Sequence, residues 1–141
     1  MRQGFSLVEL MLVVAVAGLL LGIALPRLSG AVDRIEVQSE ANRLVAAHRR
    51  ARIMAVTRSQ VLVLTIDSAN LDIRPRGQAS PLWSEDGPAA ARVTLEGPAR
   101  QFTFSPVGFT LGLSNATLRL SRGSARRTIV ISRLGRVRLV P

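Results

Sequence analysis

The stretch Gly4-Phe5-Ser6-Leu7-Val8-Glu9-Leu10, followed by an apolar run to Leu25, places one carboxylate inside an otherwise apolar segment. From Phe5 to Leu25 there are 21 residues, close to the ~20 that cross the hydrocarbon core of a bilayer as a helix. An ionised side chain at membrane depth is costly and rare, and is functional by default. The segment therefore predicts a membrane-spanning helix in which Glu9 has a function.

The charges that flank the apolar run predict its orientation. Arg2 and the free amine precede it, so the positive-inside rule places the N-terminus in the cytoplasm and the rest outside. An ordinary signal peptide is one alternative, because Ala15-Val16-Ala17 could serve as its exit, but Glu9 at the head of the apolar region is foreign to that pattern. A plain membrane anchor is another, with Glu9 in the headgroup zone near the membrane surface.

The same residues resemble the class III signal of type IV pilins and type II secretion pseudopilins. They comprise a short basic leader, Gly4 at the cut site, Phe5 after it and Glu9 four residues further on. The resemblance implies that a prepilin peptidase cleaves between Gly4 and Phe5 and that the new amine of Phe5 is N-methylated. It also implies that Glu9 pairs with the N-terminal amine of a neighbouring subunit. This role agrees with the rule that a buried charge is tolerated when it is paired.

The length of 141 residues leaves room for one anchor helix and one domain of roughly 110 residues. We expect an α+β protein with a leader peptide at 1–4, a transmembrane and filament-core helix at 5–25, an amphipathic helix at 26–58 and an antiparallel β-domain at 59–141. A bend is expected between Gly22 and Pro26. Apolar residues at three- and four-residue steps predict the buried helix face: Ile35, Val37, Ala41, Leu44, Val45, Ala51, Ile53 and Met54.

Alternating and β-branched runs after Gln60 predict antiparallel strands. We read residues 75–91 as a long surface loop, because they are rich in Pro, Gly, Ser and acidic residues. Within the loop, Trp83 is expected to fill the core or a subunit contact. Strands are predicted at Val61–Ile66, Leu71–Arg74, Arg92–Leu95, Gln101–Phe104, Ala116–Ser121, Arg127–Ser132 and Arg136–Val140.

Catalysis and metal binding have little support in the sequence. There is no Cys and only one His, His48, which lies in a helical stretch and is expected to be a solvated or packed residue. The carboxylates are scattered, and Gly108 and Gly112 lie in a turn-and-strand context rather than in a phosphate-binding loop. We therefore expect a non-enzymatic protein without cofactor or metal.

Charge is the second informative feature. The 19 basic residues are all Arg, and the segment 98–141 holds eight of them without a single Asp or Glu. Alternation along the last strand places Arg136 and Arg138 on one face. A basic patch of planar guanidinium groups favours phosphate and nucleic-acid contact. Nucleotide bias, filament contacts with acidic neighbours, anionic lipid and a solvated face remain alternatives. The aromatic residues Phe102, Phe104 and Phe109 are expected to pack, which favours duplex phosphate contact over stacking on single strands.

The C-terminal stretch also resembles the GspH/FimT branch of these proteins, through the segment Phe104 to Gly108, the strand around Leu118, and residues 127–132 leading into Gly135-Arg136-Val137-Arg138. The resemblance implies a minor pilin in the inner membrane, with a periplasmic C-terminal domain, that takes part in DNA uptake from the tip or shaft of a filament. Its DNA contacts would be Arg136 and Arg138 after Gly135, supported by Arg133, Arg126 and Arg127. The alternatives are a minor pseudopilin of type II secretion and an unprocessed, membrane-anchored periplasmic domain.

Overall fold

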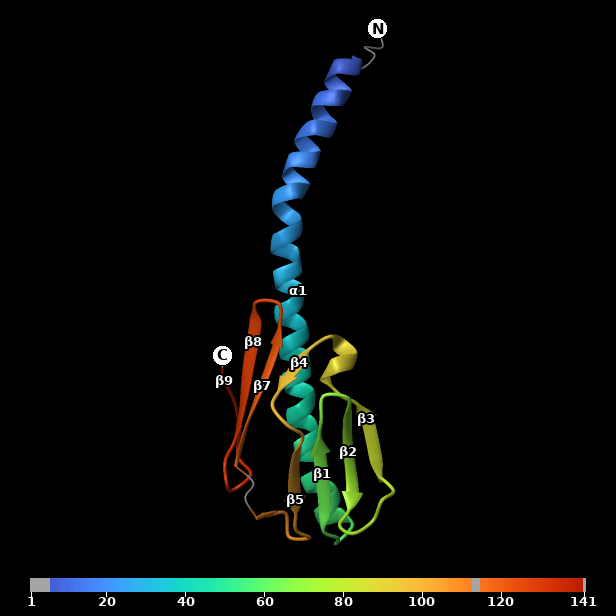
Figure 1. Cartoon of the computed structure of the whole chain (residues 1–141), viewed down its shortest axis with the longest axis vertical. Coiled ribbons are helices and arrows are strands. Elements are labelled where there is room, and N and C mark those ends of the chain that lie inside the picture. Colours follow the sequence, from blue (N-terminus) through green and yellow to red (C-terminus); the bar gives the residue numbers. More distant parts are fainter. Residues whose placement is uncertain (1–5, 113–114, 141) are drawn as a thin grey trace. The chain divides into compact units, whose positions relative to one another are not determined.

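The computed structural model describes residues 6–112 and 115–140. In this part of the chain a long helix, α1 (Leu7–Thr57), is followed by short antiparallel strands (Figure 1). The expected α+β architecture is confirmed. The predicted leader peptide at 1–4 and the cleavage bond between Gly4 and Phe5 lie outside the described residues.

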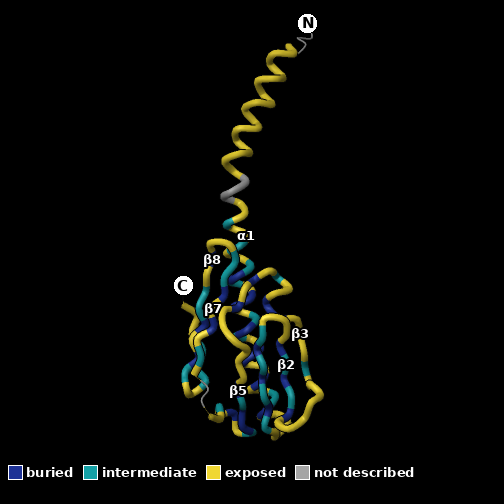
Figure 2. Tube along the Cα trace, in the orientation of Figure 1, coloured by how far each residue is buried: buried dark blue, intermediate teal, exposed yellow. Residues whose placement is uncertain are grey.

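The chain divides into two compact units, Met1–Val32 and Asp33–Pro141. In the first unit, the large apolar residues of α1 whose burial is described are exposed; the tube of Figure 2 is yellow along most of this stretch. Within the described residues, α1 is the one helix long and apolar enough to cross a membrane. The expected bend between Gly22 and Pro26 stays a prediction.

In the second unit, α1 contributes one buried stripe to the core. Its members recur at four- and three-residue steps, the spacing of one helix face: Val37, Ala41, Leu44, His48, Ala51 and Ala55. Small alanines let the sheets approach the helix backbone closely. Ile35 and Ile53 were expected on this face, which is wrong, since they are 67% and 60% exposed. Their bulk made them look like core residues, whereas they lie off the buried stripe of the helix.

The strands form two sheets beside the second unit's part of α1 (Figure 1). The first has the order β3-β2-β1-β5-β6 and the second the order β4-β7-β8-β9, and every pairing is antiparallel. Buried side chains from both sheets meet the helix stripe in one core. The strands are β1 (Leu62–Ile66), β2 (Asn70–Pro75), β3 (Trp83–Asp86), β4 (Thr94–Glu96), β5 (Arg100–Phe104), β6 (Thr110–Leu111), β7 (Ala116–Arg122), β8 (Ala125–Ile131) and β9 (Val137–Val140).

The segment read as a loop, 75–91, contains two elements that the sequence did not predict. They are strand β3 at an edge of the first sheet and a 3-10 helix, η1 (Pro88–Ala91). Trp83 is half-buried against the core and lies under the guanidinium group of Arg50, 4.9 Å from the ring centroid. The side chain of Arg43 also reaches this segment and donates to the carbonyl of Asp86. Backbone pairing with β2 and contacts with α1, rather than apolar alternation, therefore hold β3 in place.

Candidate functional site

The N-terminal processing site is described only from Ser6 onward. The hydroxyl of Ser6 accepts a hydrogen bond from the amide of Val8 at 3.3 Å, and Glu9 lies exposed in the first turn of α1. Ser at the N-cap with Glu three residues later is the spacing of a capping box. Glu9 therefore has a local reason to stand at this position, next to the positive end of the helix dipole. The spacing from Ser6 was a sequence signal that our interpretation of Glu9 did not use.

The turn between β8 and β9 is a tight one. The amide of Gly135 donates to the carbonyl of Ser132 at 2.9 Å, and the amide of Arg136 donates to the Ser132 hydroxyl at 3.1 Å. Gly135 has φ +74°, and a Cβ there would lie 3.0 Å from Cγ2 of Thr110. The positive φ favours glycine at this position, and the Thr110 side chain of β6 leaves little room for a Cβ. The turn presents Arg133 and Arg136 as exposed side chains.

Register determines which face of the second sheet each Arg of the hairpin occupies. Arg138 pairs with Val130, whose two neighbours in β8, Ile129 and Ile131, are buried. Successive residues of a strand point to opposite faces, so Val130 and Arg138 share the outer face. Arg136 precedes β9 and is also exposed. Arg133, Arg136 and Arg138 therefore gather at one end of the hairpin.

The other two cations of the predicted cluster lie elsewhere. Arg126 pairs with Ser121 near the opposite end of β8, about 13 Å along the strand from Val130. Arg127 points to the inner face, where its Nε donates to Oε1 of Gln38 at 2.7 Å. The structure thus divides the five cations that one hairpin was expected to gather. Arg127 connects the sheet to α1 and is half-buried.

The outer face of the second sheet is less uniformly basic than the sequence indicates. Arg119 of β7 lies directly opposite Glu96 of β4. Arg122 is engaged on the helix side, with its Nε 2.9 Å from the carboxylate of Asp33 and its Nη1 donating to the Ala91 carbonyl at 2.9 Å. The acid-free segment 98–141 therefore meets acids from other segments.

Two further cations come from α1, and sequence reasoning did not include them in the site. A Cβ at Gly135 would lie 3.9 Å from Cε1 of His48, and one at Gly108 would lie 3.5 Å from Nε of Arg52. Arg49 and Arg52 are both exposed and both act electrostatically on His48. The available signal was the run His48-Arg49-Arg50-Ala51-Arg52 in a predicted helix. The β8–β9 turn thus stands over a basic part of α1.

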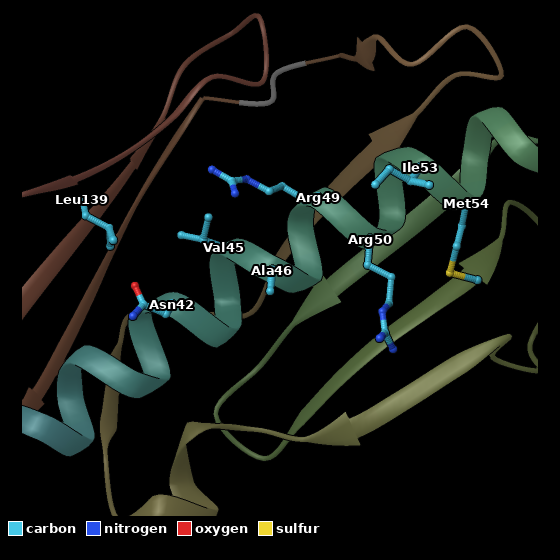
Figure 3. A pocket seen from close by; sticks show the side chains of 8 residues that line it. All are labelled: Asn42, Val45, Ala46, Arg49, Arg50, Ile53, Met54 and Leu139. Carbon is cyan, nitrogen blue, oxygen red and sulfur yellow. The ribbon is translucent and has the colours of Figure 1, made fainter.

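An open groove of about 640 Å³ runs along this part of α1. Figure 3 shows Arg49 directed towards the strand that carries Leu139, whereas Arg50 points the other way. Because Arg49 lines the same groove as Leu139 of β9, its charge adds to the positive field around this strand. The groove is lined by Asn42, Val45, Ala46, Arg49, Arg50, Ile53, Met54 and Leu139.

His48 is a packed residue, as one of our two readings of it expected. It is 2% exposed and meets the rings of Phe102 and Phe104 edge-on, at centroid distances of 5.5 and 5.0 Å. Burial lowers its pKa from 6.5 to about 4, and the charges of Arg52 and Arg49 act in the same direction. The neutral ring is therefore part of the core.

This environment predicts a pH-dependent stability. The unfolded chain binds a proton on His48 below about pH 6.5, but the folded chain does so only below about pH 4. The contribution of the neutral His48 ring to the free energy of unfolding is thus complete above pH 6.5 and is lost as the pH falls towards 4. We expect His48 to lower the free energy of unfolding by up to ~3 kcal/mol over this interval. Denaturant unfolding at several pH values should show this loss of stability in the wild-type chain but not in His48→Leu. The two proteins have the same carboxylates, so the carboxylate contributions cancel when their free energies of unfolding are subtracted. Parallel pH profiles for the two proteins would contradict it.

Comparison with known proteins decides the family. Residues 40–135 match the family Type II transport protein GspH, and residues 1–25 match the Prokaryotic N-terminal methylation motif. The chain belongs to the GspH family. The chain is also 32% identical over 157 aligned residues to the pilin-like protein PilA1 of Thermus thermophilus, covering 98% of both chains.

This GspH-family chain is also similar to solved structures of a type IV minor pilin. The type IV minor pilin FimU of Pseudomonas aeruginosa matches with a TM-score of 0.63 and 27% identity, over 77% of this chain and 90% of that one. A second crystal form of FimU matches with a TM-score of 0.57 and 24% identity, over 74% and 92%. The expected membership in the pilin and pseudopilin superfamily, GspH/FimT branch, is confirmed. Pilins and pseudopilins are structural subunits.

Proposed function

We propose that this chain is a minor pilin of a type IV filament that captures DNA through phosphate contacts during DNA uptake. The match to the N-terminal methylation motif supports cleavage by a prepilin peptidase and assembly with other pilins. Under this proposal the peptidase cuts between Gly4 and Phe5, and the amine of Phe5 becomes methylated. The match to FimU favours a pilus over a secretion apparatus.

The proposed role of Glu9 follows from the chemistry of its surroundings. Its carboxylate lies at the start of an apolar helix whose large side chains are exposed. In the membrane or in a bundle of such helices, this charge needs a partner. The N-terminal amine of Phe5 in a neighbouring subunit supplies one. The pairing lets the helix leave the bilayer for the core of a filament.

The proposed topology follows the charge at the N-terminus. The leader stays in the cytoplasm, helix α1 is held in the inner membrane through its apolar part, and the unit Asp33–Pro141 lies in the periplasm. After assembly, the same unit stands on the outside of the filament, at its tip or shaft. A ligand outside the cell can then reach its surface.

The observation that carries DNA capture is the group of exposed cations around the β8–β9 turn. Arg136 and Arg138 are exposed, and Gly135 brings them above a part of α1 that carries Arg49 and Arg52. Guanidinium forks bind phosphate oxygens without reading bases. The mechanism is therefore sequence-independent capture followed by filament retraction. Arg133 adds to the positive electrostatic field at the turn, and Arg126 adds to it from the far end of β8.

A minor pseudopilin of type II secretion is the second candidate function. The observation that favours it is the description of the matched family, Type II transport protein GspH. In that role the same surface would contact other pseudopilins or exported proteins, and DNA would be irrelevant. Absence of DNA binding at low salt is the result that would favour this candidate.

Salt-dependent binding of duplex DNA tests the first candidate. We expect the full chain in a nonionic detergent to bind a fluorescent duplex, with log affinity falling linearly with log salt concentration. Arg136→Gln/Arg138→Gln should bind more weakly and with a slope shallower by up to ~2, because two phosphate contacts are lost. Arg76→Gln/Arg92→Gln is the matched control, since it removes two exposed charges away from the turn. An equal loss in the control would show that net charge, rather than this site, binds DNA.

A further inference from the structure

Phe109 is an exposed aromatic residue on a well-defined loop. Its amide donates to the Ser105 hydroxyl at 3.1 Å, and its carbonyl accepts from the Ser105 amide at 2.8 Å. Gly108, with φ +82°, completes the loop by donating to the Ser105 carbonyl. The residue as a whole is 65% exposed. The expectation that Phe109 packs is therefore wrong, whereas Phe102 and Phe104 are buried as expected. The argument against base stacking no longer applies to Phe109.

The loop lies beside the proposed DNA-binding surface. The hydroxyl of Thr110, the residue after Phe109, donates to the carbonyl of Arg133 at 2.9 Å. On the other side, a Cβ at Gly108 would lie 3.5 Å from Nε of Arg52. Phe109 thus stands between a cation of α1 and the turn that carries Arg136. Leu134, at the tip of that turn, is 83% exposed.

We propose that Phe109 is a stacking platform for nucleic-acid bases and that the site takes single-stranded DNA in preference to duplex. This inference rests on the proposed function and names its substrate class. In a duplex the bases stack on one another, so their faces cannot reach Phe109. In a single strand, the phosphates engage the Arg side chains while one base stacks on the ring. Cationic grooves combined with exposed aromatic rings are the usual features of sequence-tolerant single-strand binding.

Base stacking on Phe109 would cost little backbone entropy, because the hydrogen bonds to Ser105 already order the loop. A ring presented on a fixed backbone loses little entropy when a base stacks on it. Val107, in the same loop, is 74% exposed and offers apolar area without a ring. It therefore serves as the matched control for Phe109. A contact between Phe109 and a neighbouring subunit is the competing explanation for its exposure.

The test compares a mixed-sequence 20-nucleotide single strand with a duplex of the same length. Both are titrated by fluorescence anisotropy against the full chain in nonionic detergent. We expect Phe109→Ala to weaken single-strand binding about 5- to 100-fold while duplex affinity changes less than about twofold. Phe109→Trp should restore the single-strand affinity, and its added indole emission should be quenched by the strand. Val107→Ala should leave both affinities unchanged. Circular dichroism confirms that each variant is folded.

Several outcomes separate this inference from the proposed function. Binding of both DNA forms with no effect of Phe109→Ala overturns the stacking role and leaves phosphate capture intact. An equal loss on single strand and duplex also overturns it, because a stacking contact must discriminate between the two. Failure of the wild-type protein to bind either form overturns both proposals. If Phe109→Ala affects only incorporation into filaments, the subunit contact is the correct explanation.

Discussion

Gly87→Ala is expected to lower the free energy of unfolding of the unit Asp33–Pro141 by about 3 kcal/mol or more. A Cβ at this position would lie 2.3 Å from the carbonyl oxygen of Ser68 and 2.7 Å from the backbone of Ala69 and Asn70. The clash is with main chain, which cannot turn aside as a flexible side chain can. Moving the two segments apart to relieve the clash would also lengthen the hydrogen bond from the Gly87 amide to the Ala69 carbonyl, which is 2.7 Å long.

The measurement is thermal unfolding of the full chain in nonionic detergent, followed by the emission of Trp83, which lies in β3 just before Gly87. The midpoint should fall by about 10 °C or more. Gly30→Ala is the control, because nothing lies within 4 Å of a Cβ there and its φ is not positive. An unfolding midpoint for Gly87→Ala within about 2 °C of wild type would show that the β1–β2 turn does not approach Gly87 as closely as described.

The architecture could be predicted from the sequence because its main signals are local. The apolar run to Leu25 and the alternation in segments such as 61–66 specify helix and strand without reference to the rest of the chain. Strands β3 and β6 were missed for a physical reason. Polar Ser84, Glu85 and Asp86 make β3 an exposed edge, and β6 has two residues, so neither carries an apolar alternation.

The candidate site was only partly predictable, because it depends on contacts between distant segments. The sequence identified Arg136 and Arg138, which alternate in the predicted strand Arg136–Val140. It could not show that Gly135 of this turn lies close to His48 of α1, or that Arg52 lies close to Gly108. Nor could it show that Phe109 is exposed: the ring belongs to an apolar segment, and only the bonds to Ser105 reveal that the loop turns it outward.

Gly4→Leu is expected to abolish processing, the largest functional effect that we predict. A bulky side chain at the cut site would keep the chain at full length, with its first residue at Met1. The unprocessed chain has no amine at Phe5 to pair with Glu9 of a neighbour, so it should also be missing from filaments. Gln3→Ala changes the adjacent leader residue without adding bulk and should be processed normally. Immunoblots of sheared filaments give the second readout. Incorporation of uncleaved Gly4→Leu chains into filaments would show that the Phe5 amine is dispensable.

The most direct test of the filament-subunit account is mass spectrometry of the N-terminus of the wild-type chain, purified from cells that contain a prepilin peptidase. The account predicts a mature chain that begins at Phe5, lacks residues 1–4 and carries one methyl group on its new amine. A chain that still begins at Met1 in these cells would contradict the account and would identify the protein as an unprocessed membrane anchor.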